Sequence, residues 1–247
     1  MRDIKDYENK YIDEINEFER YKVIYRRKKV IEIIEKFSPQ SILEIGCGME
    51  PLFCYVNNKR FIIVEPSKLF YNNAVNLSGG SPNIVCINDF FENIVEKYEQ
   101  EWEGVDMIIC SGLLHEVSEP RSLLSAIRRI CKEETVVHIE VPNANSMHRL
   151  LGVEMSLIED IYSKSENNIR LQQNTNFDMD QLKKIVEESG MKIIEEGSLF
   201  IKPFSHKQMG EMCKCGIIDE YVLDGLYNLT KYMPQFGSEI FVNCVRT

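Results

Sequence analysis

The feature that most constrains this chain is the run from Ile42 to Pro51, which reads Ile-Leu-Glu-Ile-Gly-Cys-Gly-Met-Glu-Pro. The apolar, β-branched residues within 41–45 are typical of a central parallel strand. Gly46 and Gly48 then allow the backbone to turn sharply and to approach a ligand without interference from a Cβ atom. Because open α/β sheets bind nucleotide-like ligands at the carboxyl ends of such strands, the turn predicts a cofactor site, with a helix over 51–58 behind it.

Two further apolar runs are followed by residues that could contact the same ligand. The run 61–64 ends in Glu65, whose carboxylate can accept hydrogen bonds from both hydroxyls of a ribose. The run 83–87 leads to Asp89 and Phe90, which can meet the amino group and the ring of an adenine. The spacing therefore predicts that both strand ends belong to one nucleotide site.

A fourth apolar run, residues 105–110, leads into the loop 111–117. Four strands that each end in a ligand-capable residue form a specific pattern, and four core strands with ordinary polar loop starts are the alternative. The pattern Glu-x-Gly-x-Gly resembles motif I of class I S-adenosylmethionine-dependent methyltransferases, and the resemblance extends over most of the chain. In that family, the fourth strand and its loop lie beside the transferable methyl group.

The resemblance implies that S-adenosylmethionine binds at these strand ends and leaves as S-adenosylhomocysteine. A nicotinamide-dependent oxidoreductase would use the same crevice, but the third glycine of the dinucleotide fingerprint is replaced here. A protein that binds the cofactor without catalysis would keep the same residues and lack an acceptor cavity. The residues expected to bind the cofactor are Arg27, Glu44, Gly46, Cys47, Gly48, Glu65, Pro66, Ser67, Asp89, Phe90, Ser111 and Gly112.

Arg27 joins this set from a predicted N-terminal helix. It lies four residues before Ile31 and seven before Ile34, on the side expected to be buried, where an arginine needs an anionic partner. We hypothesise that Arg27 reaches the methionine carboxylate of the cofactor. An ion pair within the protein is an equally good alternative.

The order of the elements indicates an α/β, doubly wound, Rossmann-like fold with a seven-stranded mixed sheet, helices on both faces and helical lid insertions. Besides the runs above, we predict helices near 67–78, 90–99, 119–133 and 178–190, a strand at 135–141, and an antiparallel closing pair at 191–199 and 238–245. A single methyltransferase domain is expected over 1–247, with an N-terminal helical cap at 1–37 and lid insertions at 143–177 and 204–235.

The segment 141–155 resembles a subgroup of bacterial small-molecule methyltransferases found with surface-polysaccharide or ubiquinone-type biosynthesis. That resemblance implies O-methylation of a small polar metabolite or of a sugar-derived precursor. A neutral hydroxyl acceptor needs a general base, and His115 has a suitable side chain and position after the fourth strand. The alternative for His115 is a histidine that only packs, which is also the interpretation we favour for His138, in the middle of a strand.

Cationic residues in the two insertions suit a different acceptor. His148 and Arg149 begin the first lid helix, and His206 and Lys207 open the second insertion. If these side chains converge as substrate-binding groups, they fit a phosphate, phosphoramidate or carboxylate. Such an acceptor is already nucleophilic and needs no base.

Charge and composition limit the classes of partner that we expect the protein to bind. The net charge of −10 argues against a nucleic-acid partner, because such a protein needs a basic face. Apolar stretches fall short of the roughly 20 residues of a membrane span, and no signal region is seen, so we expect a cytoplasmic protein without a membrane partner. Cys213 and Cys215 lack a second Cys/His pair, so no metal is expected. The expected partner is a small-molecule acceptor, with a homodimer through the second insertion as a further option.

Overall fold

The computed structural model describes residues 4–6, 8, 17–164, 168–169 and 173–247. Most of the predicted cap before Glu17 and part of the first predicted insertion therefore lie outside the described residues. Among the helices of the described part, none combines the length and the apolar character that a membrane crossing requires.

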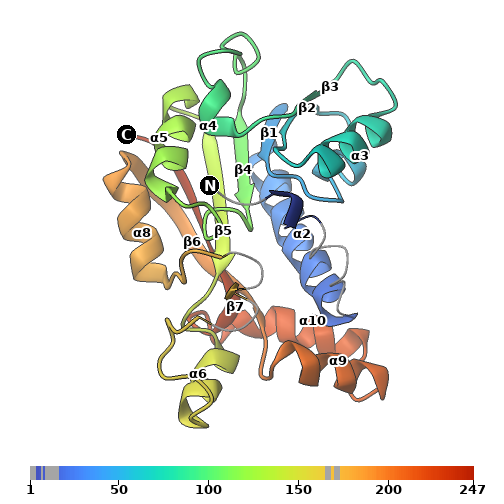
Figure 1. Ribbon diagram of the computed structural model, residues 1–247, viewed down its shortest axis with the longest axis vertical. Coiled ribbons are helices and arrows are strands. Elements are labelled where there is room, and N and C mark those ends of the chain that lie inside the picture. The colour runs from blue at the N-terminus through green and yellow to red at the C-terminus, as the bar shows by residue number, and fades with distance from the viewer. Residues whose placement is uncertain (1–3, 7, 9–16, 165–167, 170–172) are drawn as a thin grey trace.

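Seven strands form one mixed sheet in the order β3-β2-β1-β4-β5-β7-β6 (Figure 1). Strands β1 to β5 run parallel, and β7 is antiparallel to both of its neighbours, β5 and β6. The predicted fold class and the antiparallel closing pair are thus confirmed. The strands are β1 (Ser41–Ile45), β2 (Arg60–Val64), β3 (Ile84–Ile87), β4 (Met107–Ser111), β5 (Val136–Pro142), β6 (Met191–Ile201) and β7 (Gly237–Arg246).

Helices cover both faces of the sheet. Successive residues of each strand point to opposite sides, so the apolar strands form one hydrophobic core on each face. Leu43 and Ile45 pack in the core that α4, α5 and α8 cover, whereas Ile42 packs in the core that α2, α3, α9 and α10 cover. The described helices are α2 (Glu17–Phe37), α3 (Lys68–Ser78), α4 (Phe91–Ile94), α5 (Pro120–Ile130), α6 (Met147–Glu154), α8 (Met179–Glu188), α9 (His206–Lys214) and α10 (Glu220–Asn228), with 3-10 turns at Leu52–Cys54 and Leu229–Lys231.

Two predicted helices are shorter than the sequence indicated. Behind the glycine turn, only the 3-10 turn Leu52–Cys54 forms, so the predicted helix over 51–58 is wrong. Pro51 is extended, and the Leu52 N–H donates to the Glu44 carboxylate at 3.0 Å, which anchors the segment to the sheet. The helix predicted near 90–99 is reduced to α4, and beyond it the Trp102 indole N–H donates to the Val95 carbonyl at 2.8 Å.

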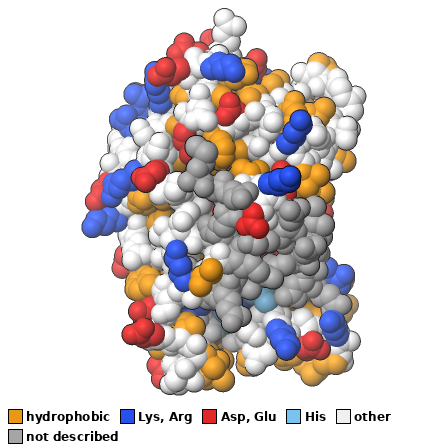
Figure 2. All heavy atoms as spheres, viewed as in Figure 1, with side chains coloured by type: hydrophobic (Ala, Val, Ile, Leu, Met, Phe, Trp, Pro, Cys, Tyr) orange, Lys and Arg blue, Asp and Glu red, His pale blue; other side chains and the backbone are white. Residues whose placement is uncertain are grey.

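The segments predicted to be lid insertions contain helices at the lower end of the molecule in Figure 1, where α6 lies apart from α9 and α10. Side chains of Lys and Arg are interspersed with those of Asp and Glu on the face shown in Figure 2, and the described residues of this face form no basic stripe. The absence of a nucleic-acid partner remains a prediction.

Candidate functional site

A cavity of about 770 Å³ lies at the carboxyl ends of the parallel strands, where the chain order reverses between β1 and β4. This is the place at which open α/β sheets bind ligands. Most of the residues predicted from the sequence line it: Arg27, Glu44, Gly46, Cys47, Gly48, Glu65, Pro66, Ser67, Ser111, Gly112, His115, His148, Arg149 and His206. Asp89, Phe90 and Lys207 are not among the lining residues.

The glycine turn lines the cavity and is hydrogen-bonded to Glu65 at the end of β2. Gly46 and Gly48 have φ angles of 77° and 58°, in the left-handed region that favours glycine. The Gly48 N–H donates to one oxygen of the Glu65 carboxylate at 3.2 Å, and the Ser67 N–H donates to the other at 2.9 Å. A carboxylate oxygen can accept more than one hydrogen bond, so these two contacts are compatible with a ligand hydroxyl.

Glu44 lies beneath this turn, and its carboxyl group has a raised pKa. Burial, with the nearby charge of Glu65, raises the pKa of Glu44 to about 8. The neighbouring Cys47 thiol also has a raised pKa, mainly because it is buried. Cys47 is therefore a packing residue of the turn and not a thiolate nucleophile.

Asp89 follows β3 but is used locally. Its carboxylate accepts hydrogen bonds from the Phe90 N–H at 2.8 Å and from the Asn93 side chain at 3.1 Å, which stabilises the start of α4. Ser67 also has a local role: its side chain caps α3 by accepting a hydrogen bond from the Phe70 N–H at 3.1 Å. Unlike Asp89, Ser67 also lines the cavity.

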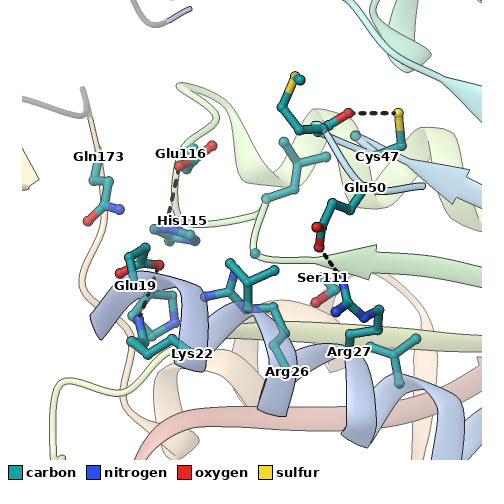
Figure 3. A pocket seen from close by; sticks show the side chains of 18 of the residues that line it. Glu19, Lys22, Arg26, Arg27, Cys47, Glu50, Ser111, His115, Glu116 and Gln173 are labelled. Atoms are coloured by element: carbon teal, nitrogen blue, oxygen red, sulfur yellow. Dashed lines mark hydrogen bonds and ion pairs between the residues drawn. The ribbon is translucent and has the colours of Figure 1, made fainter. Parts of the chain in front are cut away.

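Arg27 has the intramolecular ion pair that the sequence left open. Its guanidinium pairs with Glu50 (Figure 3). It also stacks over the Tyr55 ring, with the Cζ atom 3.8 Å from the ring centroid. Arg27 still lines the cavity, so its contact with the cofactor carboxylate remains a prediction.

The preceding residue, Arg26, is the arginine that pairs with buried carboxylates. It pairs with Glu239 on β7, and its Nε lies 3.1 Å from Glu140 on β5. Lys22 joins the same network, 3.0 Å from Glu239. Both cations hold the pKa of Glu239 well below its usual range despite its burial, whereas burial and the charge of Glu239 raise the pKa of Glu140 well above it.

His115 lies in the loop after β4 and is only 4% exposed. Its Nε2 is 3.8 Å from the Glu116 carboxylate (Figure 3). Its backbone carbonyl accepts from the Asn174 N–H at 2.9 Å. The loop begins at Gly112, whose φ is 66° and whose missing side chain leaves room for Arg26: a Cβ there would stand 3.2 Å from its Nη1. This packing fixes the direction in which the loop leaves β4.

The predicted substrate-binding cations converge only in part. His148, Arg149 and His206 line the cavity, although Arg149 donates to the carbonyls of Ile161 and Ser163 at 2.9 and 2.5 Å and so holds its own loop. Lys207 is exposed, because it follows His206 on α9 and a helix turns by about 100° per residue. Lys207 is therefore a solvated residue outside this site.

Lys202, Lys22 and Glu19 also line the cavity and were missed from the sequence. Lys202 directly follows β6, but the strand predicted from the sequence ended at residue 199, so the strand-end rule that found Glu65 stopped short of it. His138, predicted to be a core histidine, is fully buried in β5 with its Nδ1 2.8 Å from Asn243 Oδ1, which confirms that prediction. In the described parts of the chain, no three His, Cys, Asp or Glu side chains are grouped so as to hold a metal ion.

Comparisons with known proteins agree with this geometry. The family model described as a methyltransferase domain matches residues 16–196. A comparison by sequence with curated proteins found no match.

Solved structures share the fold at low sequence identity. A possible histamine N-methyltransferase from Thermotoga maritima superposes with a TM-score of 0.59 at 16% identity, covering 97% of this chain and 99% of its own. The plantazolicin methyltransferase BamL, solved with a triazolic desmethylPZN analog and SAH, gives 0.52 at 15% identity, covering 97% and 88%. The mitomycin 7-O-methyltransferase MmcR gives 0.54 at 11% identity, covering 85% of this chain and 50% of that one, so the chain spans half of its length.

Proposed function

Because the chain belongs to the methyltransferase-domain family and is an S-adenosylmethionine-dependent methyltransferase, we propose that its methyl acceptor is an oxygen of a small polar metabolite or of a sugar-derived precursor. The observation that carries the proposal is a single cavity that holds the glycine turn and Glu65 together with His115 and a second, polar region. Its volume of about 770 Å³ lies in the range of small-molecule sites.

The residues at the glycine turn fit the cofactor. Gly46 lines the cavity without a side chain, and a Cβ placed there would stand 3.5 Å from Leu113 in space next to the loop after β4. Glu65 is fixed by two backbone donors and offers carboxylate oxygens to the hydroxyls of a ribose. Bound S-adenosylmethionine supplies an electrophilic methyl group on a sulfonium.

The remaining task of the protein is to align the acceptor and to remove its proton. Methyl transfer is an in-line displacement, so positioning of the two reactants supplies much of the rate. His115 would accept the proton of the acceptor hydroxyl, and the Glu116 carboxylate beside it would stabilise the imidazolium that forms. O-methylation on this fold has a precedent in the mitomycin enzyme named above.

The test is a methyl-release assay with the purified protein, S-adenosylmethionine and pools of polar metabolites, combined with calorimetric titration of S-adenosylhomocysteine. We expect binding of the product and turnover that depends on a small-molecule fraction. Tight binding of S-adenosylhomocysteine without turnover in any pool would favour the non-catalytic alternative. Absence of binding would contradict the cofactor site itself.

A second candidate mechanism is favoured by the convergence of His148 and His206 in the cavity. In it, the anionic oxygen of a phosphate, phosphoramidate or carboxylate attacks the methyl group directly, and His115 is not required. The two mechanisms differ in their response to the loss of His115.

The net charge of the chain bears on its binding partner, and its cysteines bear on its cellular compartment. We keep a small-molecule acceptor and no nucleic-acid or membrane partner in the proposal, because the chain is acidic and its binding of duplex DNA should vanish near physiological salt. All eight cysteines are free thiols, which suits the reducing cytoplasm. A homodimer through the segment 204–235 is tested by sedimentation.

A further inference from the structure

One region of the cavity carries cationic and polar groups that methyl transfer assisted by His115 does not use. We call it the cationic corner and define it by five residues that line the cavity: Lys22, His148, Lys202, His206 and Ser238. Figure 3 shows Lys22 and its neighbour Glu19 on the same side of the cavity as His115, with Cys47 and Glu50 of the glycine turn on the other side.

Backbone contacts bring the elements of the cationic corner together. The Asn143 N–H donates to the Ser238 carbonyl at 3.0 Å and the Met147 N–H donates to the Phe236 carbonyl at 3.1 Å, so the first turn of α6 lies against the start of β7. Ile201 is paired with Gly237 in the β6–β7 register, which places Lys202 beside the same strand start. His148, Lys202 and Ser238 are thereby held on three rigid elements.

Lys202 is the central group, and it is only 1% exposed. Its Nζ lies 2.9 Å from His206 Nδ1, and His206 Nε2 lies 2.9 Å from the Glu19 carboxylate. Because the carboxylate needs a proton on Nε2, Nδ1 is the acceptor and Lys202 is the donor. No carboxylate of the described residues lies within ion-pair distance of Lys202 Nζ, and an ammonium group buried there without an anion would be costly.

Two neighbouring polar atoms are also left without partners. His148 Nδ1 and Ser238 Oγ are buried and form no hydrogen bond with any described residue. The nearest carboxylates are already used, Glu239 by Arg26 and Lys22, and Glu19 by His206. The unfilled hydrogen-bonding capacity of the cationic corner therefore calls for an acceptor with negative charge.

The strand order separates the cationic corner from the glycine turn. Lys202 follows β6, which is four strands away from β1 in the sheet. With about 4.8 Å between neighbouring strands, the two strand ends are roughly 19 Å apart along the sheet. The loop of His115 follows β4 and thus lies between them.

We propose that the cationic corner binds an anionic group of the methyl acceptor, a carboxylate or a phosphate, through Lys202, His148 and Ser238. The inference rests on the proposed function, since it names the acceptor class of that same cavity. The anion anchors the acceptor at the far end of the cavity, while the loop of His115 stands nearer to the cofactor turn.

The test uses inorganic phosphate and acetate as separate probes in calorimetric titrations of the full chain, with and without saturating S-adenosylhomocysteine. We expect at least one probe to bind the wild type, and Lys202→Met to weaken it by at least about tenfold, as for loss of a charged hydrogen bond. Lys207→Met is the matched control, because this exposed lysine lies outside the cavity. Ser238→Ala is a second, milder variant, and circular dichroism checks the fold of each.

Proton uptake gives an independent readout. Burial, with the charge of Lys22, lowers the pKa of Lys202, and a bound anion would restore its ammonium form. With acetate, which is fully ionised at neutral pH, binding enthalpies measured in buffers of different ionisation enthalpy should therefore reveal proton uptake by the wild type. The uptake should be smaller in Lys202→Met, in which only His148 and His206, whose pKa values are also lowered, remain to take up a proton.

Three results would overturn the inference. Probe binding could be equal in the wild type and in Lys202→Met, or neither probe could bind the wild type. S-adenosylhomocysteine could also compete with the probe and lose affinity in Lys202→Met, which would assign the cationic corner to the cofactor carboxylate. Failure of this inference can be distinguished from failure of the proposed function. The titrations without S-adenosylhomocysteine test anion binding alone, whereas the methyl-release assay tests methyl transfer.

Discussion

The Glu65 carboxylate, at the end of β2, accepts a hydrogen bond at 3.2 Å from the backbone N–H of Gly48 in the turn after β1. One side chain thus fixes the turn and presents acceptor oxygens to the cavity that the turn lines. A substitution of Glu65 should therefore affect both the conformation of the turn and the binding of the cofactor.

Replacement of Glu65 by glutamine should weaken binding of S-adenosylhomocysteine by about 10- to 100-fold, corresponding to the loss of a charged hydrogen bond. A glutamine amide has only one acceptor atom, so it cannot accept from Gly48, Ser67 and a ribose as the carboxylate does. Calorimetry checks the affinity. Glu96→Gln, at an exposed pair with Arg129, is the control and should bind like the wild type.

Gly46→Ala should lower both cofactor affinity and stability. The φ of 77° costs a residue with a Cβ roughly 1–2 kcal/mol, and the added Cβ would enter the cavity lining. Gly225→Ala in α10 is the matched control, since nothing lies within 4 Å of a Cβ there, and it should be neutral or slightly stabilising. Urea unfolding and calorimetry measure the two effects, and an unchanged affinity in a folded Gly46→Ala protein would argue against ligand approach at this turn.

The parts of the site that could be predicted are those in which a polar residue directly follows a buried strand. Glu65 and Ser111 satisfy this rule, and parallel strands bring their carboxyl ends to one edge whatever the details of packing. Asp89 satisfies it as well but serves α4, because short carboxylates readily bind nearby backbone N–H groups. The rule finds the edge of the sheet and not the partner of each side chain.

The orientation of α2 could not be predicted. The spacing from Ile31 and Ile34 placed Arg27 on the buried side, and its side chain is 16% exposed, but its partner is Glu50. Ile33 and Ile34 are the buried pair, and it is Arg26 that pairs with Glu140 and Glu239. A helix that contacts both the sheet and α9 has two apolar directions, and one residue shifts the face by about 100°. Which arginine forms the buried ion pairs depends on the positions of Glu140 and Glu239, which lie over a hundred residues away in the sequence.

Arg26→Met should destabilise the protein by about 3–5 kcal/mol, because it leaves the buried Glu239 with one cation fewer. Lys28→Met on the same helix is the control: its ion pair with Asp224 is exposed and should contribute less than about 1 kcal/mol. Urea denaturation of both variants gives the comparison. Equal midpoints for the two variants would contradict a structural role for the Arg26 network.

Glu44 predicts a distinctive pH dependence. Its pKa is raised from 4.5 to about 8, so the folded state holds a proton that the unfolded state releases between these values. Stability should therefore fall as the pH rises from about 5 to 8, by roughly 3–4 kcal/mol from this group. Glu44→Gln keeps an acceptor for the Leu52 N–H and should flatten this slope, becoming more stable than the wild type at pH 8. A slope that is identical in both proteins would mean that Glu44 is ionised in the fold.

His115 separates the two proposed mechanisms. If it is the base for a hydroxyl acceptor, His115→Ala should lower kcat about 10²- to 10⁴-fold, and the wild-type rate should rise with pH through the range in which an imidazole loses its proton. Affinity for S-adenosylhomocysteine should barely change, because the glycine turn and Glu65 are untouched. If the acceptor oxygen is anionic, the same substitution should cost little, and loss of His148 or His206 should raise KM instead. The position of His115 directly after β4, beside the Glu116 carboxylate, favours the first outcome, and an active His115→Ala enzyme with a flat pH profile would establish the second.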